Sequence, residues 1–147
     1  MMAEMNDLQR FLSAQENDYE IALCELTEGK KRSHWMWYIF PQLRGLGRSG
    51  MAQFYGIADI DEAKAYLENA ILSERLMACC KALLLHKNKS AFQIMGDIDS
   101  MKLKSSMTLF ALASEEENSI FQQVLQEFYD GEIDTQTLDI LASKFGK

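Results

Sequence analysis

The stretch of this sequence that decides its fold is Ser33-His34-Trp35-Met36-Trp37-Tyr38-Ile39-Phe40-Pro41-Gln42. The run from Trp35 to Phe40 is the longest uninterrupted apolar segment of the chain, and it also has strong strand propensity. If Ser33 caps a helix, that helix runs from His34 to Phe40, because Pro41 lacks an N–H and restricts the residue before it. A helix that is apolar on nearly every side belongs in the interior or along the wall of a cleft.

Apolar residues recur at helical spacing on both sides of this stretch, and glycines fall between the periodic segments. We predict helices over 7–29, divided near residue 18, and over 61–67, 71–87, 90–96, 101–113, 117–129 and 135–145. Candidate N-caps are Asp18, Ser49, Ser90 and Asp134, and Gly29 is a candidate stop. The sequence therefore predicts an all-α fold, a single compact domain of about seven to nine short helices over residues 1–147.

Charge is sorted along the chain, although the net charge is −7. Residues 105–143 carry eight acidic residues and no Lys or Arg. Residues 30–48 contain no Asp or Glu and five basic residues: Lys30, Lys31, Arg32, Arg44 and Arg48. The net charge disfavours a nucleic-acid partner, whereas the local basic stretch favours a small anion.

The cysteines and histidines do not suggest a metal site. Three cysteines without Cys-x-x-Cys spacing fit a reducing compartment, and only two histidines are available as further ligands. We therefore expect no metal and no cofactor. No segment approaches the roughly 20 apolar residues that cross a bilayer, and residues 1–7 do not resemble a signal peptide. We expect a cytoplasmic protein without membrane contact.

The glycines at 45, 47 and 50 match the letters of a dinucleotide-binding motif, Gly-x-Gly-x-x-Gly. Pro41 to Arg44 separates them from the β-prone run, and no second strand with an acidic end lies about 20 residues further on, as that motif requires. We expect these glycines to make a tight reversal instead, with Ser49 capping a short helix.

The basic stretch and the aromatic run together suggest a ligand site. Free N–H groups at the start of the predicted helix would face a phosphate or carboxylate beside Lys31 and Arg32. Trp35 or Trp37 would stack on a flat ring, and His34 would orient the ligand or transfer a proton. Core packing explains the same aromatic side chains equally well, so both interpretations stay open.

A second polar stretch lies on the predicted 101–113 helix. Lys102, Ser105 and Ser106 share one face and could hydrogen bond an anionic ligand. The hydroxyls could equally bond carbonyls one turn back. The complete candidate ligand-binding set is Lys31, Arg32, His34, Trp35, Trp37, Gln42, Arg48, Lys102, Ser105 and Ser106.

No catalytic pair can be named. Cys79 and His86 lie two turns apart on one helix face, about 10 Å, which is too far for a thiol–imidazole hydrogen bond. Whether the site performs chemistry therefore stays open. Two acid pairs are read as surface residues: Glu25 with Glu28, and Asp97 with Asp99.

Several motifs distributed over the whole chain form one pattern. They are Asp7-Leu8-x-x-Phe11 with Gln15, Tyr19, Glu25-Leu26 and Gly29; the 33–42 stretch followed by Gly45-Leu46-Gly47-x-Ser49; Glu62-Ala63, Tyr66-Leu67 and Arg75-Leu76; and Lys102-Leu103-x-Ser105-Ser106-Met107-Thr108-Leu109-Phe110. This pattern resembles the DUF1810 family. The resemblance implies a mainly helical single domain in the cytoplasm, and it implies no activity.

Two functions compete. The first is a small-molecule binding protein or enzyme, with a pocket for an anionic, nucleotide- or ADP-ribose-like ligand between the 31–48 and 102–108 segments. It predicts that these segments face each other across a concave pocket that contains His34. The alternative is a protein-interaction module or homo-oligomeric structural domain without catalytic activity, with the acidic 115–139 region as the polar rim of an apolar helix face.

Overall fold

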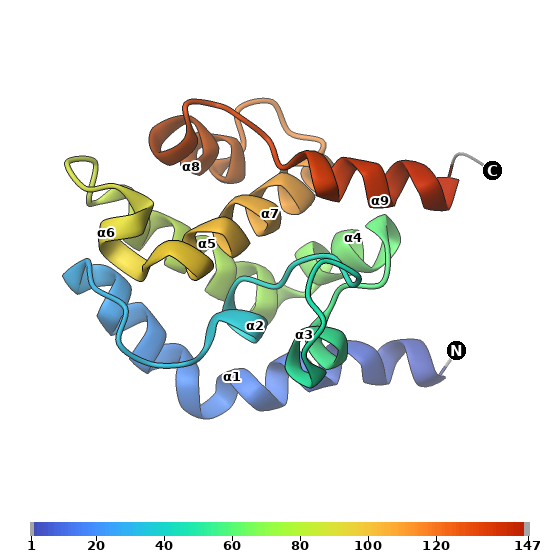
Figure 1. Ribbon diagram of the computed structural model, residues 1–147. Helices are drawn as coiled ribbons and strands as arrows, with labels where there is room; N and C mark the ends of the chain where they lie inside the picture. Colours follow the sequence, from blue (N-terminus) through green and yellow to red (C-terminus); the bar gives the residue numbers. More distant parts are fainter. Residues whose placement is uncertain (1, 146–147) are drawn as a thin grey trace.

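The structure, a computed structural model, describes residues 2–145, with side chains over residues 8–143. Within these residues the chain forms nine helices and no strand, which confirms the predicted all-α fold (Figure 1). The helices are α1 (Met2–Glu28), α2 (Met36–Ile39), α3 (Gly50–Tyr55), α4 (Ile60–Glu68), α5 (Ala70–Leu84), α6 (Ala91–Met95), α7 (Asp97–Ser114), α8 (Ile120–Tyr129) and α9 (Thr135–Phe145). Over the described part of the chain, no helix combines the length and apolar character that crossing a membrane requires.

Helices α5 and α7 form the middle of the molecule. Helix α5 packs against α1 and α8, while α7 packs against α4, α6, α8 and α9. In Figure 1, α1 runs along one side of the bundle, α8 and α9 cover the opposite side, and α2 lies between α1 and α7. The buried apolar residues of these helices join in one core cluster.

Helix α1 is continuous, so the predicted division near Asp18 is wrong. Asp18 does not cap a helix, because its carboxylate accepts a hydrogen bond from the Tyr38 hydroxyl. One turn earlier, the buried Gln15 amide donates to the Tyr38 carbonyl at 2.7 Å and to the Tyr66 hydroxyl at 3.0 Å. These tertiary contacts hold the middle of the helix. Its end is as predicted, at Gly29 with φ of 81°.

Helix α2 is shorter than the predicted 34–40 helix. It spans Met36–Ile39 and has Trp35 at its N-cap position, with no side-chain cap. The predicted cap at Ser33 is wrong because its hydroxyl donates to Glu25 instead. The predicted end is confirmed: the Phe40 N–H makes the last helical bond, to the Met36 carbonyl at 3.1 Å, before Pro41.

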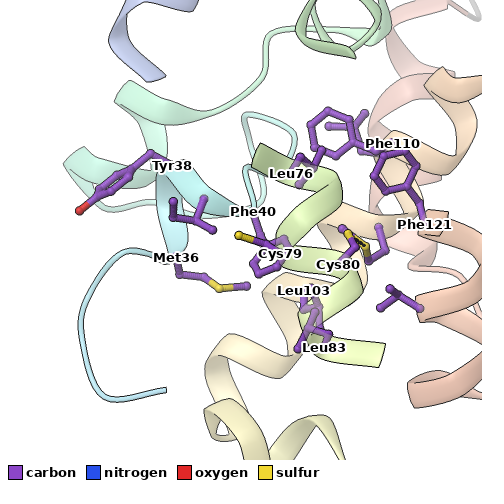
Figure 2. Packing of buried hydrophobic residues seen from close by; sticks show 14 of the residues in the cluster. Met36, Tyr38, Phe40, Leu76, Cys79, Cys80, Leu83, Leu103, Phe110 and Phe121 are labelled. Carbon is purple, nitrogen blue, oxygen red and sulfur yellow. Dashed lines mark hydrogen bonds between the residues drawn. The ribbon is translucent and has the colours of Figure 1, made fainter. Parts of the chain in front are cut away.

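The short α2 helix buries side chains on two sides. In Figure 2, Met36 and Phe40 point toward Cys79 of α5 and Leu103 of α7, whereas Tyr38 points away from them. The Tyr38 ring lies 5.1 Å from the ring of Tyr55. Core packing therefore accounts for most of the aromatic run, as one of the two sequence interpretations expected.

The glycine-rich segment is the predicted reversal. Gly45 has φ of 109°, in the region that favours glycine, and Ser49 caps α3 by accepting the Ala52 N–H at 3.0 Å. A bridge closes the loop, since the Arg44 N–H donates to the Ile57 carbonyl at 2.8 Å and the Ile57 N–H to the Gln42 carbonyl at 2.9 Å.

Helix α7 starts four residues before the predicted start at 101. The longer helix places Ile98, Met101, Lys102 and Ser105 at i, i+3, i+4 and i+7, so they share one face. Helix α8 starts at Ile120 rather than at 117, because Ser119 caps it through the Gln122 N–H.

Candidate functional site

Glu25 anchors the first half of the 33–42 stretch. Its Oε1 accepts the N–H of Arg32 at 2.9 Å, the N–H of Ser33 at 3.0 Å and the indole N–H of Trp35 at 2.9 Å. Its Oε2 accepts the Ser33 hydroxyl at 2.6 Å. The N–H groups of Arg32 and Ser33, next to the predicted start of the helix, therefore bind a carboxylate of the protein itself, and Glu25 is buried rather than a surface residue.

The protonation state of Glu25 follows from these contacts. Burial alone would raise the pKa of the carboxyl, but the hydrogen bonds from Ser33, Arg32 and Trp35 outweigh it and lower the pKa from 4.5 to about 2. Glu25 is therefore ionised at neutral pH, and its negative charge is fully engaged in holding the 32–35 segment.

Lys31 is also engaged inside the protein. Its Nζ lies 2.8 Å from Asp99 Oδ2, donates to the Ser33 carbonyl at 2.5 Å and sits 4.8 Å from the centre of the Trp35 ring. The side chain is 8% exposed. Asp99 is therefore an ion-pair partner and not the unengaged surface acid that the sequence suggested. Trp35 itself is 1% exposed, which leaves no ring face for a ligand.

The rest of the basic stretch is divided among other contacts. Arg32 is exposed and pairs with Glu28 at 2.6 Å, and Arg44 donates to the carbonyls of Gln53 and Gly56 at the end of α3. His34 and Arg48 are exposed. None of these four residues, Arg32, His34, Arg44 and Arg48, lines the cleft described next.

A cleft of about 310 Å³ lies between the 42–46 segment, α7 and the start of α9. Lys102, Ser105 and Gln42 of the candidate set line it, so the structure does bring the two predicted segments to one concave surface. His34 is not part of that surface. The full lining is Gln42, Leu46, Ile98, Met101, Lys102, Ser105, Asp134 and Gln136.

Lys102 is the cation of this cleft. Its Nζ lies 5.1 Å from the centre of the ring of Trp37, which is half-buried. Such a contact restrains a lysine without neutralising it. Among the described residues no carboxylate forms an ion pair with Lys102, whereas Lys31, Lys64 and Lys104 each have one.

The hydroxyls of α7 have different surroundings. Ser105 donates to the Met101 carbonyl at 3.2 Å, and Thr108 donates to the Lys104 carbonyl at 2.8 Å. Ser106 is fully buried, does not line the cleft, and has no hydrogen-bond partner within the described residues. The structure thus separates Ser105, at the cleft, from Ser106, in the core.

Asp134 places a carboxylate in the same cleft. It caps α9 as predicted, because its Oδ2 accepts the Thr137 N–H at 2.9 Å and the Thr137 hydroxyl at 2.6 Å. The Asp134 N–H donates to the Thr108 hydroxyl at 2.9 Å, which ties the start of α9 to α7. The cleft therefore contains one cation and one anion on different elements.

Two other clefts lie beside α8. One, of about 340 Å³, has charged residues on its rim, but its lysine, Lys64, is paired with Glu115 at 3.2 Å. The other, of about 370 Å³, has only uncharged lining residues, among them the exposed Leu112 and Ile133. Among the described residues, neither of these two clefts is lined by a lysine or arginine without an ion-pair partner.

The buried thiols are unsuited to nucleophilic chemistry. Burial raises the pKa of Cys79 to about 12 and raises that of Cys80 well above its ordinary value, so both stay protonated at neutral pH. His86 has a structural contact, with Nε2 at 2.9 Å from the carbonyls of Leu26 and Thr27 at the end of α1. Over the described side chains, no group of three or more His, Cys, Asp or Glu residues is placed to hold a metal ion.

Fold and site together define a small all-α protein in which the start of the 33–42 stretch is folded around the buried carboxylate of Glu25. The chain belongs to the family described as "Protein of unknown function (DUF1810)", which it matches over residues 5–141. It is similar to the conserved hypothetical protein Rv1873 from Mycobacterium tuberculosis, known from a crystal structure at 1.38 Å. The two share 45% sequence identity with a TM-score of 0.89, and the match covers 92% of this chain and 96% of the other. A search of curated proteins gives no match.

The sequence contained signals for two features that the predictions missed. Glu25 stands beside Leu26 and three residues after Ala22, both fully buried, so it lies on the buried stripe of α1. Ile98 and Met101 lie on the stripe of Lys102 and Ser105, which becomes visible once the helix is started at Asp97.

Proposed function

We propose that this protein binds a small anionic, flat-ringed molecule of the nucleotide or ADP-ribose type in the cleft between the 42–46 segment, α7 and α9. The proposal depends on the surroundings of Lys102. This lysine lines the cleft, its ammonium lies over the Trp37 ring, and it has no ion-pair partner among the described residues. An ammonium in this position attracts an anion, since the nearby apolar surface limits its solvation.

The other lining residues fit the rest of such a ligand. Leu46, Ile98 and Met101 provide apolar surface for a flat ring, and Ile98 and Met101 are 69% and 66% exposed. Large apolar side chains at a cleft that also holds a few polar groups are typical of small-molecule sites. Gln42 and Gln136 add amides that both donate and accept hydrogen bonds.

A binding screen with a matched pair of lysine variants tests the proposal. Thermal-shift measurements against nucleotides, ADP-ribose, sugar phosphates and inorganic phosphate identify a binder, and calorimetry gives its Kd. Lys102→Gln is expected to weaken binding about tenfold or more, because a charge-assisted hydrogen bond contributes about 1.5–3 kcal/mol.

Lys104→Gln is the control. Lys104 lies on the same helix, but it pairs with Glu132 at 3.4 Å and does not line the cleft. Its replacement should leave Kd unchanged. Equal Kd values for Lys102→Gln and the unchanged protein would place the ligand elsewhere and overturn the proposal.

A homo-oligomer is the second candidate, and one observation favours it. Leu112 and Ile133 are 44% and 42% exposed and line the uncharged cleft beside α8. Exposed apolar residues at a cleft are a feature of protein interfaces. Light scattering over a wide concentration range tests this: a dimer mass that Leu112→Ser returns to the monomer supports it, and a constant monomer mass excludes it.

A further inference from the structure

We infer that the ligand of the Lys102 cleft is a single nucleoside monophosphate, with its phosphate at Lys102 and its ribose hydroxyls at Asp134. This inference rests on the proposed function of the same cleft. It adds the size of the ligand and the direction in which it lies.

The cleft has a positive and a negative end along α7. Lys102 and Ser105, three residues apart on α7, both line the cleft, and the buried Thr108, which does not line it, lies three residues further along the helix. With a rise of 1.5 Å per residue, Lys102 and Thr108 are about 9 Å apart along the helix axis. Asp134 does line the cleft, and its N–H bond to the Thr108 hydroxyl attaches it to α7 on the C-terminal side of Lys102 and Ser105.

At the negative end, the Ser105 hydroxyl and the Asp134 carboxylate can accept hydrogen bonds from a ligand but cannot donate them. The hydroxyl proton of Ser105 is committed to the Met101 carbonyl, so its oxygen can only accept from a ligand. Asp134 uses Oδ2 to cap α9, and within the described residues its Oδ1 makes no hydrogen bond. Acceptors of this kind match hydroxyl groups on a sugar.

A phosphate is excluded from the same end. The start of α9 would otherwise attract an anion, but the Asp134 carboxylate already occupies it as the N-cap. A phosphate placed there would meet a like charge. The phosphate therefore belongs at Lys102, and a molecule with both a phosphate and free hydroxyls lies between Lys102 and Asp134 in one direction only.

The volume of the cleft matches a ligand of one nucleotide. Ligand pockets span about 300–1,000 Å³, and at about 310 Å³ this cleft is at the lower end. A base against Leu46, Ile98 and Met101, a ribose and one phosphate fill such a space. The second ribose and phosphate of ADP-ribose would extend beyond the lining residues.

Calorimetry with three classes of probe tests the inference on the full chain. The probes are the common nucleoside 5′-monophosphates, their 2′,3′-dideoxy counterparts, and inorganic phosphate. The unchanged protein is expected to bind its preferred monophosphate about tenfold more tightly than the dideoxy form, as for the loss of a hydrogen bond to a charged group. ADP-ribose should bind no more tightly than the monophosphate.

Asp134→Asn is the diagnostic variant, because Asn caps a helix as well as Asp does. It should abolish the preference for the ribose hydroxyls and strengthen the binding of inorganic phosphate, since the like charge is gone. Asp139→Asn, an exposed residue of the same helix outside the cleft, should keep the preference.

The possible failures are distinct. Equal binding of monophosphate and dideoxy form, both tighter than phosphate and both weakened by Lys102→Gln, overturns the inference and leaves the proposed function intact. Tighter binding of ADP-ribose than of the monophosphate does the same. No binding of any probe, or binding that Lys102→Gln does not change, overturns both.

Discussion

The indole N–H of Trp35 donates to the Glu25 carboxylate at 2.9 Å and so fastens the aromatic segment to the helix that precedes it. The same oxygen accepts the N–H groups of Arg32 and Ser33. A carboxylate with three donors on one oxygen is a strong acceptor of charge-assisted bonds. In this chain, the first half of the 33–42 stretch is thus a loop that encloses an internal anion.

Glu25→Gln should destabilise the protein by about 2–3 kcal/mol. The amide oxygen can still accept the N–H groups of Arg32, Ser33 and Trp35, but these bonds lose the negative charge that strengthens them, and an NH2 group replaces the oxygen that accepts the Ser33 hydroxyl. Urea denaturation at neutral pH measures the effect. Glu28→Gln is the control, since Glu28 is exposed and its partners, Arg32 and the Cys24 thiol, are exposed as well, and it should change little.

The same carboxylate makes stability depend on pH. Because the pKa of Glu25 is lowered to about 2 in the folded protein, from 4.5, its stabilising contribution is complete above pH 4.5 and is lost as the pH falls toward 2. The free energy of unfolding of the unchanged protein should therefore drop over this range, and more steeply than that of Glu25→Gln. Parallel curves for the two proteins would contradict the assignment.

The two tryptophans should respond differently to replacement by Phe. Trp35→Phe loses the bond to Glu25 and leaves a gap at a residue that is 1% exposed, so we expect a loss of about 2 kcal/mol. Trp37→Phe alters a half-buried ring and should cost less than about 1 kcal/mol. Denaturation followed by circular dichroism compares them, and equal losses would be inconsistent with the Glu25 bond.

Two glycines around α3 form another matched pair. A Cβ on Gly56 would lie 2.7 Å from the Cα of Arg44, a backbone atom that cannot move aside, so Gly56→Ala should cost about 2–3 kcal/mol. A Cβ on Gly50 meets no atom within 4 Å, and Ala favours the helix that starts there. Gly50→Ala should therefore leave the melting temperature unchanged or raise it.

The thiols should differ in reactivity. Cys24 is exposed, whereas Cys79 and Cys80 are buried and their pKa values are raised by burial, to about 12 for Cys79. A thiol reagent should modify one cysteine in the folded protein and three after denaturation, and raising the pH to about 9 should not change the folded count. Rapid modification of a second thiol in the folded state would show that α5 opens locally.

The positions that the sequence predicted best depend on near neighbours. The caps at Ser49, Ser90 and Asp134 and the stop at Gly29 each involve contacts within a few residues, and the structure has all of them. The division of α1 was predicted wrongly for the opposite reason: Asp18 looks like a cap locally, but its partner is Tyr38, twenty residues away.

The candidate site was predicted in part. Gln42, Lys102 and Ser105 do line one cleft, as the pairing of the 31–48 and 102–108 segments required. Lys31, Arg32 and Trp35 instead contact Asp99, Glu28 and Glu25. Asp134 was predicted as a helix cap, and nothing in its local sequence indicates that it also lines the cleft of Lys102.

By itself, the sequence determined the helical fold, most helix boundaries and the segment on which the family signature lies, because periodicity and capping act over one or two turns. Only the tertiary structure decided which charges remain available. The basic stretch of 30–48 contains no acid, yet remote carboxylates neutralise Lys31 and bind the backbone N–H groups beside it. Lys102, which looked like one lysine among several, is left unpaired at a cleft among the described residues. Electrostatic pairing depends on distance in space, and chain folding alone brings such partners together.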